Sequence, residues 1–179
     1  MLTITIPAAE AWDEIKQEFI YVNETTLELE HSLVSLSKWE SKWQKAFLSS
    51  KDKTDEEILD YIRCMTITQN VNPNIYNYIN SNNMTEINRY IAAPMTATVF
   101  SDKNNKPSHE IITSELIYYW MIALNIPFEC QYWHLNRLLT LIKVCNIKNS
   151  PKKKMSKRDI MSRNAALNAA RRKQLNTTG

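Results

Sequence analysis

The sequence predicts a mainly α-helical fold with a small N-terminal β-sheet (α+β), in which a compact helical domain is followed by a basic helical tail. Three observations lead to this fold class. The apolar spacing changes from two residues to three or four near Ser32, the only glycine is Gly179, and positive charge gathers after residue 147. A length of 179 residues suits one domain of ordinary size with an appended segment.

The first thirty residues carry the alternation that is typical of strands. Residues 2–6 read LTITI, with threonine alternating with branched apolar side chains. Residues 18–22 (EFIYV) and 25–30 (TTLELE) flank a turn-like Asn-Glu pair. We expect these three segments to form the small sheet.

A helix of about four turns is expected to begin at Ser32, because apolar residues then recur at three- and four-residue steps with lysine and glutamate between them. These apolar residues are Leu33, Leu36, Trp39, Trp43, Ala46 and Phe47.

A second helix is expected after Thr54. Thr54 and Glu57 have the spacing of a capping box, and the stripe formed by Ile58, Ile62 and Met65 follows. Two shorter helices are expected at about 73–80 and 84–92. We read MTATVF (95–100) as a strand and SDKNNKPS (101–108) as an exposed loop.

Helices at about 113–125 and 129–145 complete the expected core, and Pro127 predicts a bend between them. Trp133, Leu135, Leu138, Leu139 and Ile142 are expected to form the buried face of the second helix. The apolar run 117–124 is too short for a membrane span, which needs about twenty residues.

The composition excludes several kinds of chemistry. Without internal glycine the chain has no P-loop, no GxGxxG loop, no GxSxG elbow and no kinase glycine-rich loop. The three cysteines are widely spaced, and no histidine has a second one three or four residues away. We therefore expect no metal, no cofactor and no enzymatic activity. The N-terminal sequence lacks the pattern of a secretory signal, which favours a cytoplasmic location.

Four tryptophans fall in near pairs, Trp39 with Trp43 and Trp120 with Trp133. They either fill the core, since large aromatic side chains dominate burial, or expose Trp39 and Trp43 as anchors for a partner. His134 and Arg137 are expected on flanking faces of their helix. This histidine serves either acid–base chemistry or a structural hydrogen bond.

The clearest boundary in the chain is electrostatic and separates residues 1–147 from 148–179. Residues 148–173 carry a net charge of +9, and the rest of the chain carries −6. Asp159 is the one acid of this basic segment, and its spacing from Ser156 predicts a helix N-terminus there. The basic residues are Lys148, Lys152, Lys153, Lys154, Lys157, Arg158, Arg163, Arg171, Arg172 and Lys173.

The apolar side of this tail is thin, so a helix there gains little by packing. Three interpretations stay open: nucleic acid as the partner, an acidic protein surface that includes the body of a neighbouring copy, or a solvated tail without a partner.

Three segments resemble small proteins encoded among the tail genes of phages and prophages of Gram-positive bacteria. They are LELEHSLVSLSKWESKW (27–43), EIITSELIYYWMIALNIPFECQYWHLNRLLTLIKVCNIKN (110–149) and MSKRDIMSRNAALNAARRKQLN (155–176). The resemblance points to Trp39, Glu40, Trp43, Tyr118, Tyr119, Trp120, Trp133, His134, Asn136, Arg137, Ser162, Arg163, Asn164 and Arg171. It assigns no catalytic role to them.

By size and gene setting, that group is similar to tail assembly chaperones, which hold the tape measure protein in the host cytoplasm while the tail tube polymerises. The resemblance thus implies a non-enzymatic assembly protein in the infected bacterium. A virion structural protein, such as a tail or head-tail connector subunit, and a nucleic-acid-binding factor are the alternatives. The expected contact residues are Trp39, Trp43, His134, Arg137, Lys152, Lys153, Lys154, Lys157, Arg158, Arg163, Arg171 and Arg172.

Overall fold

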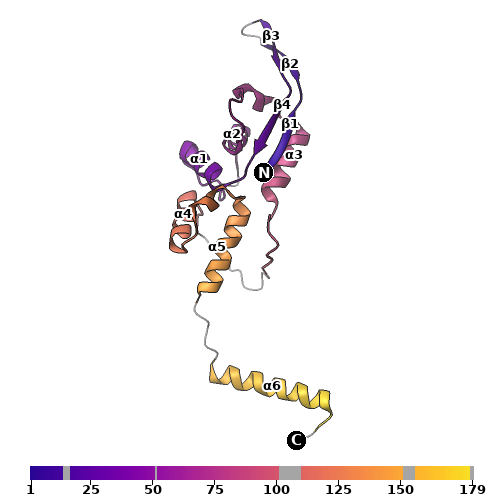
Figure 1. The fold of residues 1–179 in the computed structure, drawn as a ribbon, viewed down its shortest axis with the longest axis vertical. Helices are drawn as coiled ribbons and strands as arrows, with labels where there is room; N and C mark the ends of the chain where they lie inside the picture. Colours follow the sequence, from indigo (N-terminus) through magenta and orange to yellow (C-terminus); the bar gives the residue numbers. More distant parts are fainter. Residues whose placement is uncertain (14–16, 51, 101–109, 151–155, 178–179) are drawn as a thin grey trace. The chain divides into compact units, whose positions relative to one another are not determined.

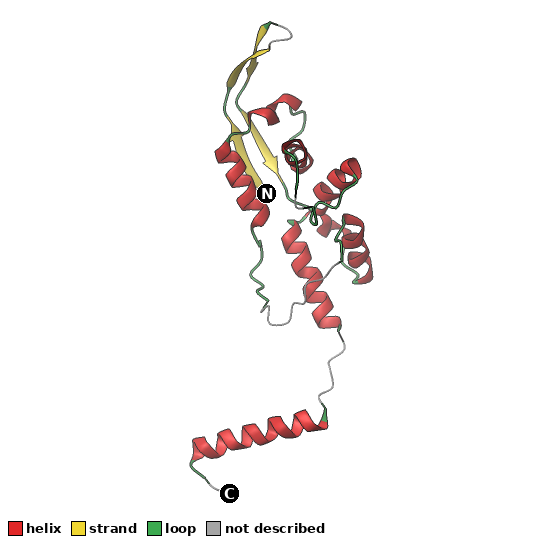
Figure 2. Ribbon diagram, turned by 180° about the vertical axis from the view of Figure 1, so that it is seen from behind, coloured by secondary structure: helices red, strands yellow, loops and turns green. Residues whose placement is uncertain are grey.

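A computed structural model describes residues 1–13, 17–50, 52–100, 110–150 and 156–177 (Figure 1). The mainly α-helical fold class with a small N-terminal sheet is confirmed (Figure 2). Contacts divide the chain into two units, Met1–Asn146 and Ile147–Gly179.

The N-terminal strands form one long antiparallel ribbon with a single register. Strand β1 (Leu2–Ile6) pairs with β4 (Thr25–Leu29), and β2 (Ala9–Asp13) pairs with β3 (Glu18–Val22). In both pairs the two residue numbers add up to 31, as in Leu2 with Leu29 and Asp13 with Glu18, so β2 and β3 continue the ribbon of β1 and β4 (Figure 1).

The sequence predicted β1, β3 and β4 but missed β2. The expected turn at the Asn-Glu pair, residues 23–24, was also wrong, because β3 and β4 follow one another along the same arm of the ribbon. The backbone pairing of the ribbon is interrupted where residues 7–8 lie opposite residues 23–24. Pro7 has no N–H to donate there, which accounts for the break.

The β1–β4 part of the ribbon has one buried and one exposed face. Ile4 and Ile6 on β1, with Leu27 and Leu29 on β4, are buried, whereas the threonines between them on β1 are exposed. Trp39, Tyr61, Ile62, Met65, Ile87 and Tyr90 pack with this face in one hydrophobic cluster. The alternation read from the sequence is confirmed.

Helix α1 (Leu33–Trp43) begins at Ser32, whose hydroxyl accepts a hydrogen bond from the Ser35 backbone. The expected four turns were too many, because Gln44 adopts the left-handed conformation and ends the helix. Phe47 therefore lies outside the helix, where its ring stacks on that of Tyr61 with centroids 3.8 Å apart.

Helix α2 (Asp55–Met65) begins with the predicted capping box: the Thr54 hydroxyl accepts from the Glu57 N–H, and the Glu57 carboxylate accepts from the Thr54 N–H. The two expected shorter helices are a 3₁₀ helix, η1 (Pro73–Tyr78), and α3 (Ser81–Ala92).

The strand expected at 95–100 is absent from the described structure, which shows no regular element there. Met95 has a positive φ of 49°, and Val99 is 90% exposed. Without a neighbouring strand to pair with, the local β-propensity of this segment has no effect. The loop expected at 101–108 lies outside the described residues.

The expected bend at Pro127 is confirmed. Helix α4 (Ser114–Ala123) ends before Asn125, which has a φ of 53°, and a short 3₁₀ helix, η2 (Phe128–Tyr132), precedes α5 (Leu135–Asn149). The single helix expected at 129–145 was wrong at its start, because the chain is extended at Trp133 and the Leu135 N–H donates to the His31 carbonyl at 2.7 Å.

A second cluster joins α1, α4 and α5 through Leu33, Leu36, Ile117, Met121, Leu135, Leu138 and Ile142. Trp133 and Leu139, which were expected in the buried face of α5, are half-buried at its edge.

The second unit contains α6 (Lys157–Leu175), capped by Ser156 as predicted and ended by the left-handed Asn176. None of its nineteen residues, all of which the structure describes, is buried. No helix in the described parts of the chain is long and apolar enough to cross a membrane.

Candidate partner-binding site

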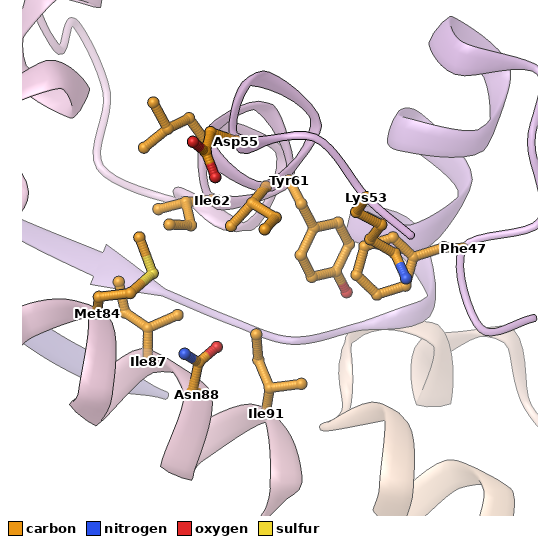
Figure 3. Close-up of a pocket in the computed structure, with 11 residues that line it drawn as sticks. Phe47, Lys53, Asp55, Tyr61, Ile62, Met84, Ile87, Asn88 and Ile91 are labelled. Carbon is orange, nitrogen blue, oxygen red and sulfur yellow. The ribbon is translucent and has the colours of Figure 1, made fainter. Parts of the chain in front are cut away.

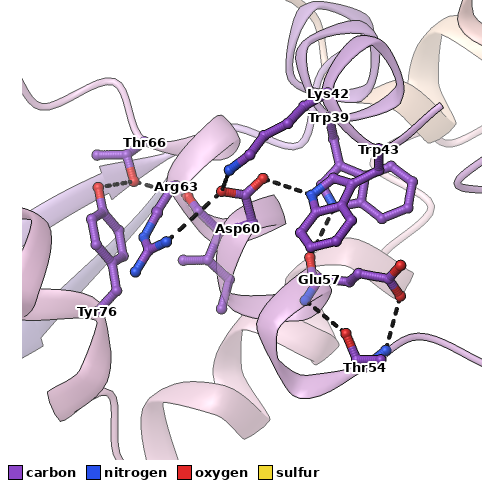
Figure 4. Close-up of polar contacts among 10 residues, drawn as sticks. Trp39, Lys42, Trp43, Thr54, Glu57, Asp60, Arg63, Thr66 and Tyr76 are labelled. Carbon is purple, nitrogen blue, oxygen red and sulfur yellow. Dashed lines mark hydrogen bonds and ion pairs between the residues drawn. The ribbon is translucent and has the colours of Figure 1, made fainter. Parts of the chain in front are cut away.

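The indole groups of Trp39 and Trp43 connect α1 to α2 by hydrogen bonds (Figure 4). The Trp39 indole N–H donates to the Glu57 carbonyl at 2.8 Å, and the Trp43 indole N–H donates to the Asp60 carboxylate, also at 2.8 Å. Lys42 pairs with the other oxygen of Asp60 at 2.6 Å. The expectation that these tryptophans fill the core is thus confirmed for Trp39, which is fully buried.

The alternative, in which both tryptophans anchor a partner, is wrong for Trp39, because no part of its side chain is exposed. Trp43 is half-buried, so its side chain is partly accessible.

His134 is also buried, at 5% exposure, and lies just before α5 rather than on a flank of it. Its Nε2 lies 3.0 Å from the Tyr90 carbonyl, and its ring packs edge to face against that of His31. It is therefore not available as a surface contact. Arg137 is exposed, and its guanidinium lies over the Trp133 ring at 4.1 Å from the centroid.

The five basic residues predicted as contacts on α6 are all exposed: Lys157, Arg158, Arg163, Arg171 and Arg172. Lys152, Lys153 and Lys154, which were predicted with them, lie outside the described residues.

Tyr61 and His31, two groups with shifted pKa values, form a buried hydrogen-bonded pair. The Tyr61 hydroxyl lies 2.6 Å from the His31 Nδ1, but burial raises the pKa of Tyr61 well above its ordinary value, and burial together with His134 lowers that of His31 to about 3. Both shifts disfavour proton exchange near neutral pH. Burial likewise raises the pKa of the Cys64 thiol to about 11.

In the described parts of the chain, no group of three or more His, Cys, Asp and Glu residues could hold a metal ion. All three cysteines are described, and all three are free thiols.

An apolar groove of about 520 Å³ lies between α2 and α3 (Figure 3). Tyr61, Ile62 and Ile87 are its buried floor, because the same residues pack against the β1–β4 ribbon. Its walls are half-buried apolar side chains, namely Ile58 and Leu59 from α2 and Met84 and Ile91 from α3. We call this cavity the α2/α3 groove.

Polar groups stand at the rim of the α2/α3 groove. The Lys53 ammonium donates to the Ser50 carbonyl at 2.6 Å and lies 4.4 Å from the centroid of the Phe47 ring. Partial burial lowers the pKa of Lys53, while the nearby Glu57 carboxylate opposes that shift. Asp55 and the exposed Asn88 also line the groove, so its apolar interior is bordered by both charges and an amide.

The sequence showed the apolar stripes that form this groove but did not reveal the groove itself. Of the predicted apolar stripe, Ile62 and Met65 are buried, whereas Ile58 is half-buried in the wall of the groove. Met84, Ile87 and Ile91 have the three- and four-residue spacing of a helix face, which indicates burial without indicating what covers each residue.

No family model matches the chain, and no match was found among the curated proteins or the solved structures with which it was compared.

Proposed function

We propose that this protein is a non-enzymatic phage tail assembly protein, a chaperone that holds the tape measure protein in the cytoplasm of the infected host while the tail polymerises. The observation that carries the proposal is the α2/α3 groove, an apolar surface that the described part of the chain leaves open.

A helix is the partner element that fits this groove. Two helices border it, its walls are aliphatic and its rim is polar, which is the arrangement of proteins that bind the apolar face of an amphipathic helix. Successive apolar side chains of that helix would lie between Ile58 and Leu59 on one side and Met84 and Ile91 on the other. An acidic residue of the partner would meet the Lys53 ammonium at the rim.

A holding protein needs such a surface and needs no reactive centre. Burial lowers the pKa values of His31 and His134 and raises those of Cys130 and the half-buried Cys64, and both shifts are away from reactivity, which agrees with a binding role. The resemblance of residues 27–43, 110–149 and 155–176 to phage tail-region proteins supplies the biological setting and the tape measure protein as partner.

Co-expression with the tape measure protein tests the groove. We expect a soluble complex that co-purifies, and we expect the Met84→Glu variant to lose it, because a carboxylate would stand in the apolar wall. Asn82→Glu, an exposed position on the same helix, is the matched control and should retain the complex. Circular dichroism confirms that both variants fold. If the wild-type chain gives no complex, or Met84→Glu binds as well as Asn82→Glu, the proposal fails.

Mass spectrometry of gradient-purified particles, beside the cell lysate, separates a chaperone from a virion structural protein. Abundance in the lysate with absence from the particles supports the chaperone. Tens of copies in each particle would instead make the protein a building block of the tail or of the head-tail connector.

A further inference from the structure

Helix α6 is basic around its whole circumference. Its nineteen residues include six arginines and lysines and one acid, Asp159. At 100° per residue, Lys157, Arg158, Arg172 and Lys173 spread over about half of the helix surface, and Arg163 and Arg171 occupy the other half. Both ends are capped within the unit, by Ser156 and Asn176. The helix therefore presents positive charge on all sides, and its caps come from its own unit.

A polyanion suits this surface better than a protein groove does. No residue of α6 is buried. Its larger apolar side chains, Ile160, Met161, Leu167 and Leu175, lie on one side of the helix, but Asn164, Asn168 and Arg171 lie among them and interrupt the apolar surface. The sequence from 147 to 179 contains no aromatic residue, so the unit has no platform on which unpaired bases would stack. The regularly spaced phosphates of a duplex are the polyanion that this charge distribution matches.

One face of α6 carries the side chains that read base pairs. Asn164, Asn168 and Arg171 stand at positions i, i+4 and i+7 and so lie along one line of the helix. Asparagine pairs with adenine and arginine with guanine in the major groove. Arg158 and Arg172 flank this line on one side and Arg163 on the other, at angles that suit the two phosphate strands.

We propose that α6 binds double-stranded DNA in the major groove, with Asn164, Asn168 and Arg171 towards the base edges and Arg158, Arg163 and Arg172 on phosphates. The narrow major groove of duplex RNA does not admit a helix, so DNA is the ligand. This activity goes beyond the proposed chaperone function and is independent of the α2/α3 groove.

The electrostatic part is tested by fluorescence anisotropy of the full-length chain with a labelled 20-base-pair DNA at several salt concentrations. Three to five phosphate contacts predict a slope of log K against log salt of about −3 to −5. Arg158→Gln with Arg172→Gln should make the slope less steep by about 2 and weaken binding roughly fifty-fold at 0.1 M salt.

The matched control is Lys38→Gln with Arg89→Gln, which removes the same charge from exposed positions of the body. The proposal predicts that this control leaves the slope unchanged. Equal losses in the two double variants would overturn it, as would absence of duplex binding at 20 mM salt or tighter binding to single-stranded DNA or duplex RNA.

Base reading is tested by selection from a pool of random duplexes. The wild-type chain should enrich particular sequences, and Asn164→Ala with Asn168→Ala should abolish the enrichment while leaving the salt slope unchanged. Enrichment that persists in this variant would overturn the assignment of the reading face. Loss of tape measure binding in the arginine variant, without any DNA binding by the wild type, would show that α6 serves a protein partner instead.

Discussion

The imidazole rings of His31 and His134 pack edge to face with their centroids 5.1 Å apart, and both side chains are buried. They join the end of the β-ribbon to the start of α5, where the Leu135 N–H also donates to the His31 carbonyl.

Burial favours the neutral form of both rings. Tyr61 hydrogen-bonds to the His31 Nδ1, and the Tyr90 carbonyl lies against the His134 Nε2. The Glu30 carboxylate accepts a hydrogen bond from the Tyr90 hydroxyl and pairs with the N-terminal ammonium at 2.9 Å. Burial lowers the pKa of His134 as well, although the Tyr90 carbonyl and Glu30 oppose the shift.

We expect the free energy of unfolding to fall in mild acid. The folded chain holds the pKa of His31 near 3, below the ordinary 6.5, so the unfolded chain binds the extra proton between these values. Neutral His31 contributes fully to the free energy of unfolding above pH 6.5. As the pH falls from 6.5 towards 3, the free energy of unfolding decreases by about 1.4 kcal/mol per pH unit. Between pH 6.5 and 5 the loss is about 2 kcal/mol.

Urea unfolding of the wild type and of His31→Asn measures this effect. Asparagine keeps an acceptor near the Tyr61 hydroxyl and does not titrate, so the variant should lose less stability between pH 6.5 and 5 than the wild type does. If the free energy of unfolding changed with pH in the same way in both proteins, the role of His31 would be contradicted.

Trp43→Phe should lower the free energy of unfolding by about 2 kcal/mol, because the indole N–H donates to the buried Asp60 carboxylate. Urea denaturation gives the value, and Tyr119→Phe, at an exposed position of α4, serves as the control. A double-mutant cycle with Asp60→Asn isolates the pair. A coupling energy of zero would mean that the hydrogen bond between Trp43 and Asp60 does not contribute to the free energy of unfolding.

Glu40→Gln should destabilise the fold by about 2 kcal/mol. The buried Glu40 carboxylate accepts from the Phe47 N–H at 2.9 Å and from the Ser114 N–H at 2.7 Å, so it links the chain after α1 to the start of α4. An amide accepts through its oxygen alone and presents an N–H₂ group to the second donor. Thermal and urea unfolding measure the loss, and an unchanged midpoint would refute the link.

Removing residues 150–179 should leave the urea midpoint unchanged and the free energy of unfolding within about 0.5 kcal/mol of the full-length value, because α6 buries no residue. Matched denaturation curves of the full-length and shortened chains test this. A marked drop in the midpoint would show that the body depends on the tail for its stability.

The sequence alone determined the elements whose signals are local. Ser32, Thr54 and Ser156 begin helices as predicted, because a cap requires only a side chain and the backbone N–H three residues later. The alternation of buried and exposed residues in β1 and β4 and the bend at Pro127 also depend on neighbouring residues alone. The charge difference between body and tail is a property of composition and needs no structure.

Only the tertiary structure decided which faces meet. It joined four strands in one register, ended α1 at Trp43 so that Phe47 reaches Tyr61, and left the segment 95–100 without a partner strand. It buried Trp39 and His134, which a helical pattern alone allowed at the surface, and it opened the α2/α3 groove. Burial depends on contacts between residues that lie far apart in the chain, and the spacing of one segment carries no information about the segment that covers it.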